Sequence, residues 1–151
     1  MLKKGDRAPD FTLTDQYGER RQLSELLHDG PVVVYFYPAD FTPGCTKEAC
    51  GLRDMNQELI RSGLRVVGIS PQDAESHQRF GEKHQLPFPL LADTDKTVIR
   101  AYGVDGPLGF GVRRATFLVA RDGLIRNSVL ADFRIGEHLE FVNAAIADMD
   151  A

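Results

Sequence analysis

Residues 32–50 read VVVYFYPADFTPGCTKEAC and contain both cysteines of the 151-residue chain. The first part, residues 32–37, is apolar, β-branched or aromatic throughout, which is typical of a strand buried on both faces of a parallel sheet. Pro38 ends this strand, and Gly63 stands where a left-handed helix cap is expected. Between them, apolar residues recur at helical spacing, namely Ala49, Leu52, Met55, Leu59 and Ile60. The sequence therefore predicts that Cys45 opens a helix directly after a buried strand.

The position of Cys45 favours a reactive thiol. Open α/β sheets bind ligands at the carboxyl ends of their strands, and the free amides and dipole of a helix N-terminus stabilise a thiolate. Pro43 and Gly44 tighten the entry to the helix, and Gly44 lets a small ligand approach the backbone. Thr42 adds a hydroxyl that can donate to the thiolate or accept from a bound hydroxyl. An inert buried cysteine is the alternative and the commoner fate of a lone cysteine, but these surroundings favour a nucleophile.

Cys50 follows Cys45 by five residues in the predicted helix. In a regular helix the two Cα atoms would stand about 8 to 9 Å apart. A disulfide needs Cα atoms closer than about 7 Å, so a bond between these cysteines requires the first helical turns to unwind. A five-residue spacing is therefore typical of a disulfide that forms only transiently. In the reduced state Cys50 could equally be a small apolar residue on the core face of the helix, and the two interpretations are compatible.

The chain resembles the peroxiredoxins at these residues. Pro38, Thr42 and Cys45 match the family motif Pro-x-x-x-Thr-x-x-Cys, and residues 42–50 are similar to the branch of bacterioferritin comigratory protein, or PrxQ. The similarity extends over most of the chain, through residues 5–11, 34–38, 68–70 and 114–118.

The resemblance implies a thiol-dependent peroxidase that reduces hydrogen peroxide and organic hydroperoxides without a metal or organic cofactor. Its members attack peroxide with the cysteine matching Cys45, which becomes a sulfenic acid. The cysteine matching Cys50 then condenses with it to an intramolecular disulfide, which thioredoxin or a glutaredoxin-like dithiol reduces. This sequence of states is the reversible part of the cysteine oxidation ladder.

The resemblance also assigns roles to the residues around the sulfur. Pro38 shields it, Thr42 hydrogen-bonds the peroxide together with Gly44, and Arg114 stabilises the thiolate and the transition state. Glu48 is expected to orient that arginine.

Arg113 and Arg114 precede a predicted strand, so their side chains point to opposite faces and only one can reach Cys45. The motif match selects Arg114. The alternative for either arginine is a solvated strand end.

The remaining elements predict a thioredoxin-like α/β sandwich, in which helices flank one central mixed β-sheet. Strands are expected at residues 11–13, 21–23, 65–69, 90–92, 115–120 and 124–130, and helices at 24–27, 73–85, 93–102 and 139–149. The first two strands form an N-terminal β-hairpin of the kind that peroxiredoxins add to a thioredoxin-like core. Residues 121–123 turn a second hairpin.

Composition indicates one soluble globular domain over residues 1–151, with 42% hydrophobic and 26% charged residues. The net charge of -4 argues against binding to nucleic acid or to anionic membranes. No signal core or run of about 18 apolar residues is present, and two cysteines close in sequence suit a reducing compartment. We therefore expect a cytoplasmic protein, and the resemblance suggests a monomer.

Several other motifs carry no function in this interpretation. Residues 68–70 resemble the start of a serine nucleophile elbow, but Gln72 replaces its second glycine. Residues 106–111 lack the spacing of a phosphate loop, and we expect a flexible loop, shorter than in the family. His77 and His84 could share a helix face, but without Cys or carboxylate partners they predict a solvated face rather than a zinc site. His28 and His138 are expected to be solvated as well.

Other functions remain as alternatives. A thioredoxin-like disulfide reductase normally uses Cys-x-x-Cys, whose sulfurs bridge without unwinding a helix, whereas four residues separate Cys45 from Cys50. A non-catalytic thioredoxin-fold binding or holdase protein would keep its cysteines for packing alone, which the joint presence of Thr42, Cys45 and Arg114 disfavours. A Cys-His hydrolase needs a histidine in a partner motif, and none of the four histidines lies in one.

Overall fold

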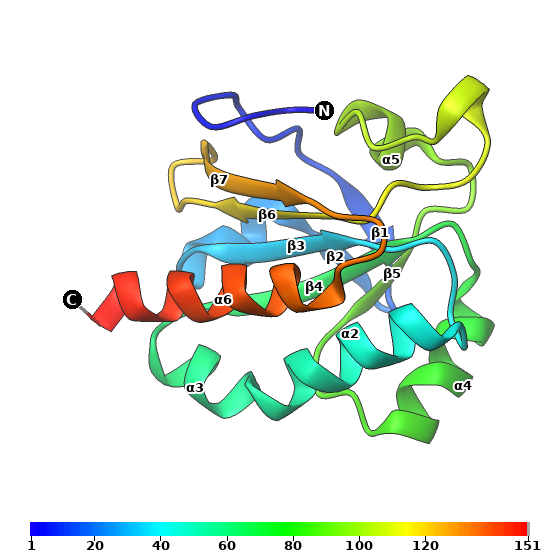
Figure 1. The fold of residues 1–151 in the computed structure, drawn as a ribbon, viewed down its shortest axis with the longest axis horizontal. Helices are drawn as coiled ribbons and strands as arrows, with labels where there is room; N and C mark the ends of the chain where they lie inside the picture. Colours follow the sequence, from blue (N-terminus) through cyan, green and yellow to red (C-terminus); the bar gives the residue numbers. More distant parts are fainter. Residues whose placement is uncertain (151) are drawn as a thin grey trace.

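The fold, obtained as a computed structural model that describes residues 1–150, is built on one seven-stranded sheet (Figure 1). The strands are β1 (Thr12–Thr14), β2 (Arg20–Gln22), β3 (Val32–Phe36), β4 (Arg65–Ser70), β5 (Leu90–Ala92), β6 (Ala115–Val119) and β7 (Ile125–Leu130). The helices are α1 (Leu23–Leu26), α2 (Pro43–Asp54), α3 (Asn56–Arg61), α4 (Ala74–His84), α5 (Thr97–Ala101) and α6 (Ile135–Asp150). Single 3₁₀ turns lie at Leu27–Asp29 and Pro107–Gly109.

The sheet is mixed, with strand order β2-β1-β5-β4-β3-β6-β7. β3, β4 and β5 run parallel, as the apolar run at residues 32–37 predicts, while β6 pairs antiparallel with β3 on its other side. The N-terminal β1–β2 hairpin and the β6–β7 hairpin complete the two edges, both antiparallel. The predicted thioredoxin-like mixed sheet with an N-terminal hairpin is therefore confirmed.

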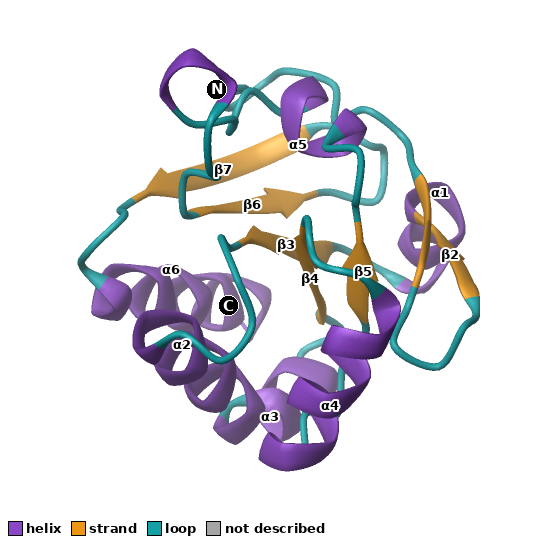
Figure 2. Cartoon of the chain, turned by 90° about the vertical axis from the view of Figure 1, so that its right-hand side faces the viewer, coloured by secondary structure: helices purple, strands orange, loops and turns teal. Residues whose placement is uncertain are grey.

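Side chains of β3 alternate between two apolar cores, one on each face of the sheet. Val33 and Tyr35 pack with residues of α2, α3, α4 and α6. Val34 and Phe36 pack on the opposite face with residues of α1, α5 and the N-terminal segment. Figure 2 shows these two helical layers, with α2, α3, α4 and α6 together on one side of the sheet. Burial on both faces explains the continuous apolar run, because neither face of β3 meets water.

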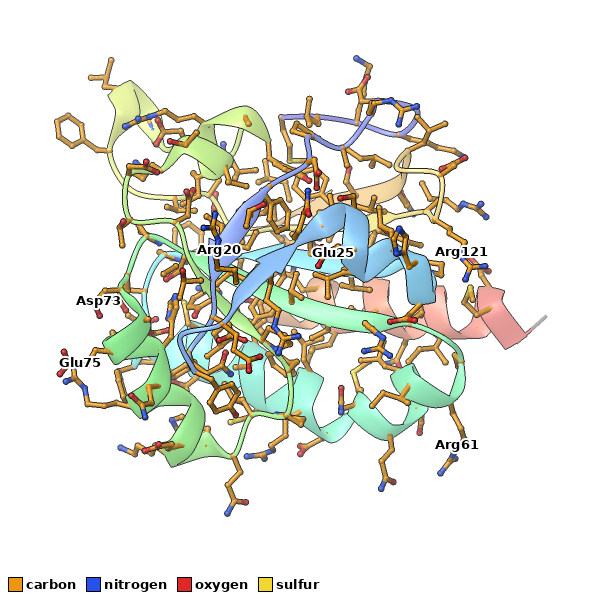
Figure 3. All side chains as sticks on the ribbon, turned by 180° about the vertical axis from the view of Figure 1, so that it is seen from behind. Arg20, Glu25, Arg61, Asp73, Glu75 and Arg121 are labelled. Carbon is orange, nitrogen blue, oxygen red and sulfur yellow. The ribbon has the colours of Figure 1, made fainter. Side chains whose placement is uncertain are left out.

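Charged side chains gather on the outside of these layers. Seen from behind, Arg20, Glu25, Arg61, Asp73 and Glu75 project from the ribbon toward solvent (Figure 3), and all five are exposed. Within the described residues, no helix is long and apolar enough to cross a lipid bilayer.

The segment after Cys45 differs from the single helix that its apolar spacing predicts. α2 begins at Pro43 and ends at Asp54, and α3 starts anew after Met55. Ile60 is 62% exposed whereas its neighbour Leu59 is fully buried, so the assignment of Ile60 to the apolar stripe was wrong. Gly63 does adopt the predicted left-handed conformation, with φ of 83°.

The remaining boundaries move by a few residues. Asp73 caps α4 as predicted, accepting a hydrogen bond from the Ser76 amide at 2.8 Å. α5 starts at Thr97 rather than at Asp93, whose buried carboxylate accepts hydrogen bonds from the amides of Val98 and Ile99 and so anchors the helix start. In α6, Met149 is 42% exposed and lies outside the buried stripe expected for that helix.

Candidate active site

Cys45 lies in the first turn of α2, beyond the carboxyl end of β3, where the sequence places it. Thr42 is the extended N-cap residue of this helix and Pro43 is its first residue. Phe41, with φ of 65°, reverses the chain between the strand and the helix. The Cys45 side chain is free, and the residue is only 1% exposed. The sulfur is therefore a buried thiol at the positive end of a helix, where a negative charge is stabilised.

The guanidinium of Arg114 contacts the sulfur directly. Its Nη2 donates to Cys45 Sγ at 3.2 Å, while its Nη1 donates to Glu48 Oε1 at 2.7 Å. Both charged side chains are almost fully buried, at 6% and 0% exposure. The neighbouring Arg113 turns away and donates to Asp132 at 2.8 Å. The alternation expected along this segment is thus observed, and Arg114 is the arginine that reaches Cys45.

Glu48 sits one turn after Cys45 on α2, so it presents its carboxylate beside the same guanidinium. Burial raises the pKa of Glu48 to about 7, although the charge and hydrogen bond of Arg114 act in the opposite direction. Its second oxygen, Oε2, is buried without a hydrogen-bond partner among the described residues. The carboxylate therefore orients Arg114 with one oxygen and leaves the other unsatisfied.

Thr42, Gly44 and Pro38 surround the entry to α2. The Thr42 hydroxyl donates to the carbonyl of Ala39 at 2.9 Å, so its proton is not available to the thiolate and its lone pairs remain free to accept. A Cβ at Gly44 would stand 3.1 Å from Arg114 Nη2, so only glycine leaves the guanidinium unhindered at this position. Pro38 lies near Gly44 and Arg114, because all three residues line the same surface cleft.

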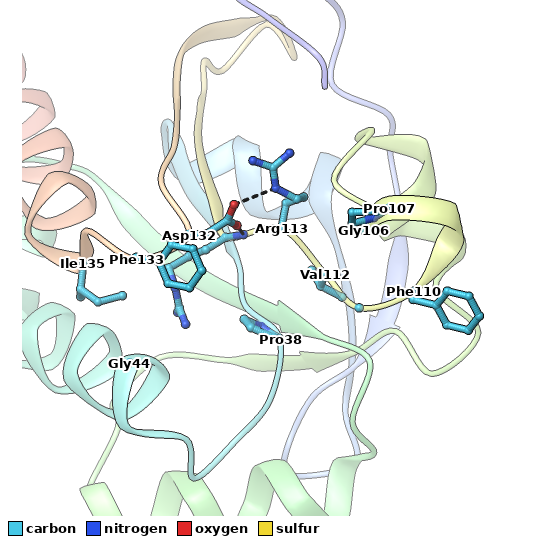
Figure 4. Close-up of a pocket in the computed structure, with 12 residues that line it drawn as sticks. Pro38, Gly44, Gly106, Pro107, Phe110, Val112, Arg113, Asp132, Phe133 and Ile135 are labelled. Atoms are coloured by element: carbon cyan, nitrogen blue, oxygen red, sulfur yellow. Dashed lines mark hydrogen bonds and ion pairs between the residues drawn. The ribbon is translucent and has the colours of Figure 1, made fainter.

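A cleft of about 650 Å³ opens over these residues (Figure 4). Gly44 and Arg114 form its inner end, and Val112, Phe133 and Ile135 contribute apolar walls. Phe110 and Phe133 are large exposed apolar side chains, at 78% and 96% exposure. The cleft therefore joins a charged inner end beside Cys45 to an apolar mouth.

Residues 105–112 form one wall of this cleft and are tied to α5. Lys96 donates to the carbonyls of Gly109 and Gly111 at 2.9 and 2.8 Å and forms an ion pair with Asp105. The segment that the sequence predicts as a flexible loop thus contains a 3₁₀ turn with a specific anchor. The sequence gives no local sign that Lys96 anchors this segment, because the partners of Lys96 lie 9 to 15 residues further along the chain.

Cys50 shares α2 with Cys45, and both cysteines are free. The helix is continuous between them, which places the two Cα atoms about 8 to 9 Å apart. Next to Cys50, a Cβ at Gly51 would lie 2.7 Å from Leu139, so α2 approaches α6 closely at this point. The structure is that of the reduced, helical state, in which the two sulfurs cannot bond.

The sequence pattern of the AhpC/TSA family matches residues 4–128. The chain belongs to the AhpC/TSA family. Among curated relatives, peroxiredoxin Bcp of Escherichia coli K12 is 44% identical over 147 residues, covering 93% of both chains. The chloroplastic peroxiredoxin Q of Oryza sativa subsp. japonica is 42% identical over 149 residues, covering 95% of this chain and 68% of the relative.

Solved structures agree with this assignment. Peroxidoxin BcpB from Mycobacterium tuberculosis superposes with a TM-score of 0.90 at 40% identity, covering 99% of this chain and 97% of that one. Peroxiredoxin Q from Xanthomonas campestris gives a TM-score of 0.83 at 29% identity, covering 91% and 90%. The protein is therefore a peroxiredoxin of the Bcp/PrxQ type and a thiol peroxidase.

Sequence reasoning missed a buried network that anchors the active-site loop of this peroxiredoxin. Asp40 accepts hydrogen bonds from Tyr37 Oη at 2.6 Å and from Ser76 Oγ at 2.8 Å, and lies 2.7 Å from His77 Nδ1. The other ring nitrogen of His77 faces the Leu91 carbonyl at 3.1 Å. The expectation of a solvated His77 was wrong, because α4 turns this residue toward the sheet, where both ring nitrogens find partners.

His138 is the second histidine that the sequence misplaces. It is 1% exposed on α6, with Nδ1 2.8 Å from the Thr116 hydroxyl and Nε2 2.8 Å from the Ala131 carbonyl. Its Nδ1 also lies 3.7 Å from Glu48 Oε2. Burial lowers the pKa of His138, and the positive charge of Arg114 acts in the same direction. The expectation of a solvated His138 was wrong, because packing of α6 on the sheet and α2 encloses the ring.

Proposed function

We propose that this peroxiredoxin reduces hydrogen peroxide and organic hydroperoxides with Cys45 as the attacking residue. The observation that carries the proposal is the 3.2 Å contact between Arg114 Nη2 and Cys45 Sγ at the N-terminus of a helix. A fixed positive charge and helix amides together favour the thiolate, which is the nucleophilic form. The thiolate attacks one peroxide oxygen, the O–O bond breaks, and Cys45 becomes a sulfenic acid while the leaving oxygen takes a proton.

Thr42 and Arg114 are suited to hold the peroxide in line with the sulfur. The Thr42 hydroxyl already donates to Ala39, so it can act only as an acceptor toward the O–H of a bound peroxide. Arg114 has a preorganised N–H beside the sulfur, where negative charge develops on the leaving oxygen. Gly44 leaves space at the inner end of the cleft, and Pro38 limits access of water.

The apolar walls of the cleft support activity on organic hydroperoxides as well as on hydrogen peroxide. Val112, Phe133 and Ile135 could contact an alkyl chain while the peroxide group reaches Arg114. A structural relative, the bacterioferritin comigratory protein of Xanthomonas campestris, is described as having alkyl peroxide reduction activity.

Cys50 is the proposed resolving cysteine. Its thiolate would attack the sulfur of the Cys45 sulfenic acid and form an intramolecular disulfide, while the S–O bond breaks and the leaving hydroxide takes up a proton to become water. Because α2 holds the two residues too far apart for this bond, its first turns must unwind and leave the contact with Leu139. Thioredoxin or a glutaredoxin-like dithiol then reduces the disulfide by thiol–disulfide exchange.

We also propose a cytoplasmic monomer. A disulfide that must be re-reduced in every cycle suits a reducing compartment. Every side chain assigned to the reaction comes from one chain, so the proposed site needs no second copy.

Stopped-flow measurements would test the proposed function. Reduced protein should consume hydrogen peroxide and cumene hydroperoxide in a rapid first turnover, and should continue to turn over only when thioredoxin and its reductase are supplied. A disulfide reductase would instead reduce insulin disulfides without peroxide, and a binding protein would do neither. Slow peroxide consumption that persists in Cys45→Ser would contradict the proposal.

A further inference from the structure

The ring of His138 has one nitrogen that can exchange a proton. Nε2 lies 2.8 Å from the carbonyl of Ala131, which can only accept, so Nε2 carries a hydrogen. Nδ1 is therefore the nitrogen whose protonation can change. It lies 2.8 Å from the Thr116 hydroxyl, which can either donate to it or accept from it, and 3.7 Å from Glu48 Oε2.

Glu48 presents the complementary atom to this nitrogen. Its Oε1 accepts from Arg114, but Oε2 is buried without a hydrogen-bond partner among the described residues. An ionised oxygen without a donor is unfavourable in a buried site. A proton on His138 Nδ1 would give Oε2 the donor that it lacks after a small approach of the two side chains, with Nδ1 turning from the Thr116 hydroxyl toward the carboxylate. Burial shifts the two groups in the directions that favour such sharing, since it raises the pKa of Glu48 to about 7 and lowers that of His138.

The charge on Cys45 determines whether it is favourable for Glu48 and His138 to hold this proton. With Cys45 as a thiolate, the buried cluster holds two negative charges, on Cys45 and Glu48, against the single positive charge of Arg114. One further proton makes the cluster neutral. Once Cys45 is an uncharged sulfenic acid, Arg114 and Glu48 balance each other and the additional proton is no longer favoured.

The other polar and charged groups that face this pair belong to neighbouring elements. Asp132 follows β7, and its negative charge, like that of Glu137 on α6, favours protonation of His138. Tyr35 on β3 faces Glu48 with a buried hydroxyl, and burial raises the pKa of Tyr35 far above neutrality, so it stays uncharged. None of these groups reacts with peroxide, so among the described neighbours of the pair Cys45 is the one whose charge changes in the reaction.

We propose that Glu48 and His138 together hold one proton while Cys45 is a thiolate, and release it when peroxide oxidises Cys45. This inference rests on the proposed role of Cys45. In the step, the thiolate forms a bond to the terminal oxygen of R–O–O–H, the O–O bond breaks, and two electrons pass from sulfur to peroxide. The products are Cys45–SOH and RO⁻, and the proton released by the pair balances the formation of ROH. His138 is a positioning residue in this scheme, since it acts through Glu48 and Arg114.

Nuclear magnetic resonance of the histidine rings would test the coupling without measuring activity. The His138 signals of reduced protein, assigned by their loss in His138→Gln, would be followed over pH 5 to 9 and compared with those of Cys45→Ser, which has no thiolate. The loss of one buried negative charge disfavours protonation of its neighbours, and a shift of one pH unit corresponds to about 1.4 kcal/mol of interaction. The His138 transition should therefore occur at least about one pH unit lower in Cys45→Ser. His28, which is exposed, is the internal control and should not move.

Equal midpoints in the two proteins, or no His138 transition in either, would overturn the inference. The outcome is separate from the fate of the proposed function, because peroxidase activity that survives in Cys45→Ser would count against Cys45 and not against the proton pair.

The rate profile adds a second measurement. The rate constant for oxidation of Cys45 by hydrogen peroxide should decline at alkaline pH as the pair loses its proton. In His138→Gln the amide can donate to Glu48 but cannot hold the proton, so this decline should begin about one pH unit lower. The matched variant His28→Gln should keep the parent profile. An unchanged profile in folded His138→Gln would also overturn the inference.

Discussion

Arg114 bridges two buried groups of helix α2, with Nη2 3.2 Å from the sulfur of Cys45 and Nη1 2.7 Å from the carboxylate of Glu48. The two planar N–H groups of one guanidinium thus hold the nucleophile and its orienting carboxylate at a fixed separation. Arg114 approaches from the start of β6, beside β3, so the pairing of these two central strands sets the distance. The guanidinium of Arg114 is therefore the group through which Cys45 and Glu48 contact each other.

Replacement of Cys45 by serine should abolish peroxidase activity while the fold remains intact. The change exchanges one sulfur for a smaller and far less acidic hydroxyl at the same buried position. Peroxide consumption and circular dichroism would check the two parts of this prediction. Activity near the parent level would remove Cys45 from the reaction.

Arg114→Ala should slow the attack on peroxide by roughly 10²-fold or more, the scale of losing one preorganised electrostatic group. Arg113→Ala is the matched control, because Arg113 pairs with Asp132 outside the contact with sulfur. Its rate should stay close to the parent value. Single-turnover stopped-flow kinetics would compare the two variants, and a reversed order would contradict the role of Arg114.

Thr42→Val should also slow the attack, since valine keeps the shape of threonine and lacks a hydroxyl to accept from the peroxide. The same change removes the hydrogen bond to Ala39, worth about 1 kcal/mol. Urea unfolding would measure that loss separately from the rate. A rate equal to that of the parent protein would show that the hydroxyl takes no part in binding peroxide.

Oxidation should melt the start of α2, because the Cys45–Cys50 bond and a regular helix are incompatible. Hydrogen exchange should show protected amides over residues 44–51 in the reduced protein and lost protection in the oxidised protein. Mass spectrometry would confirm the intramolecular disulfide. An oxidised form with this bond and a fully protected helix would refute the mechanism.

Cys50→Ser should still consume peroxide once and then stall with a sulfenic acid on Cys45. Without a resolving thiol, this species should proceed to irreversible over-oxidation unless an external thiol intercepts it. Mass spectrometry during a peroxide titration would follow each added oxygen. Sustained thioredoxin-dependent turnover in this variant would show that another group resolves Cys45.

Glu48 should make the free energy of unfolding depend on pH between about 4.5 and 8. Its pKa rises from 4.5 to about 7 on burial, so in this range the native state binds a proton that the unfolded chain releases. The contribution of Glu48 to the free energy of unfolding is fully present below pH 4.5. It is lost as the pH rises through 7, by roughly 3 kcal/mol in total. Glu48→Gln should remove this dependence, measured by urea unfolding at pH 5 and 8. The exposed Glu140→Gln should leave it unchanged.

Local sequence patterns were sufficient to predict β3, the start of α2 and the mixed sheet around them. A continuous apolar run, a proline that ends it and helical spacing after Cys45 are properties of neighbouring residues, and they act through short-range backbone preferences. Strand alternation also predicts that the side chains of Arg113 and Arg114 point to opposite faces. The break at Met55 was not predictable from that spacing, because apolar periodicity continues through it while the helix axis does not.

The sequence by itself determined that Cys45 and Arg114 belong to one site, since residues 38–45 and Arg114 match the peroxiredoxin pattern and Arg114 contacts the sulfur. Only the tertiary structure decided how that site is supported. His138 lies 90 residues beyond Glu48, and His77 lies 37 beyond Asp40. An isolated histidine carries no local sign of its partners, because burial and hydrogen bonding of its ring arise only when α4 and α6 pack on the sheet. The surroundings of Glu48 and Asp40 therefore depend on packing as well as on the motif.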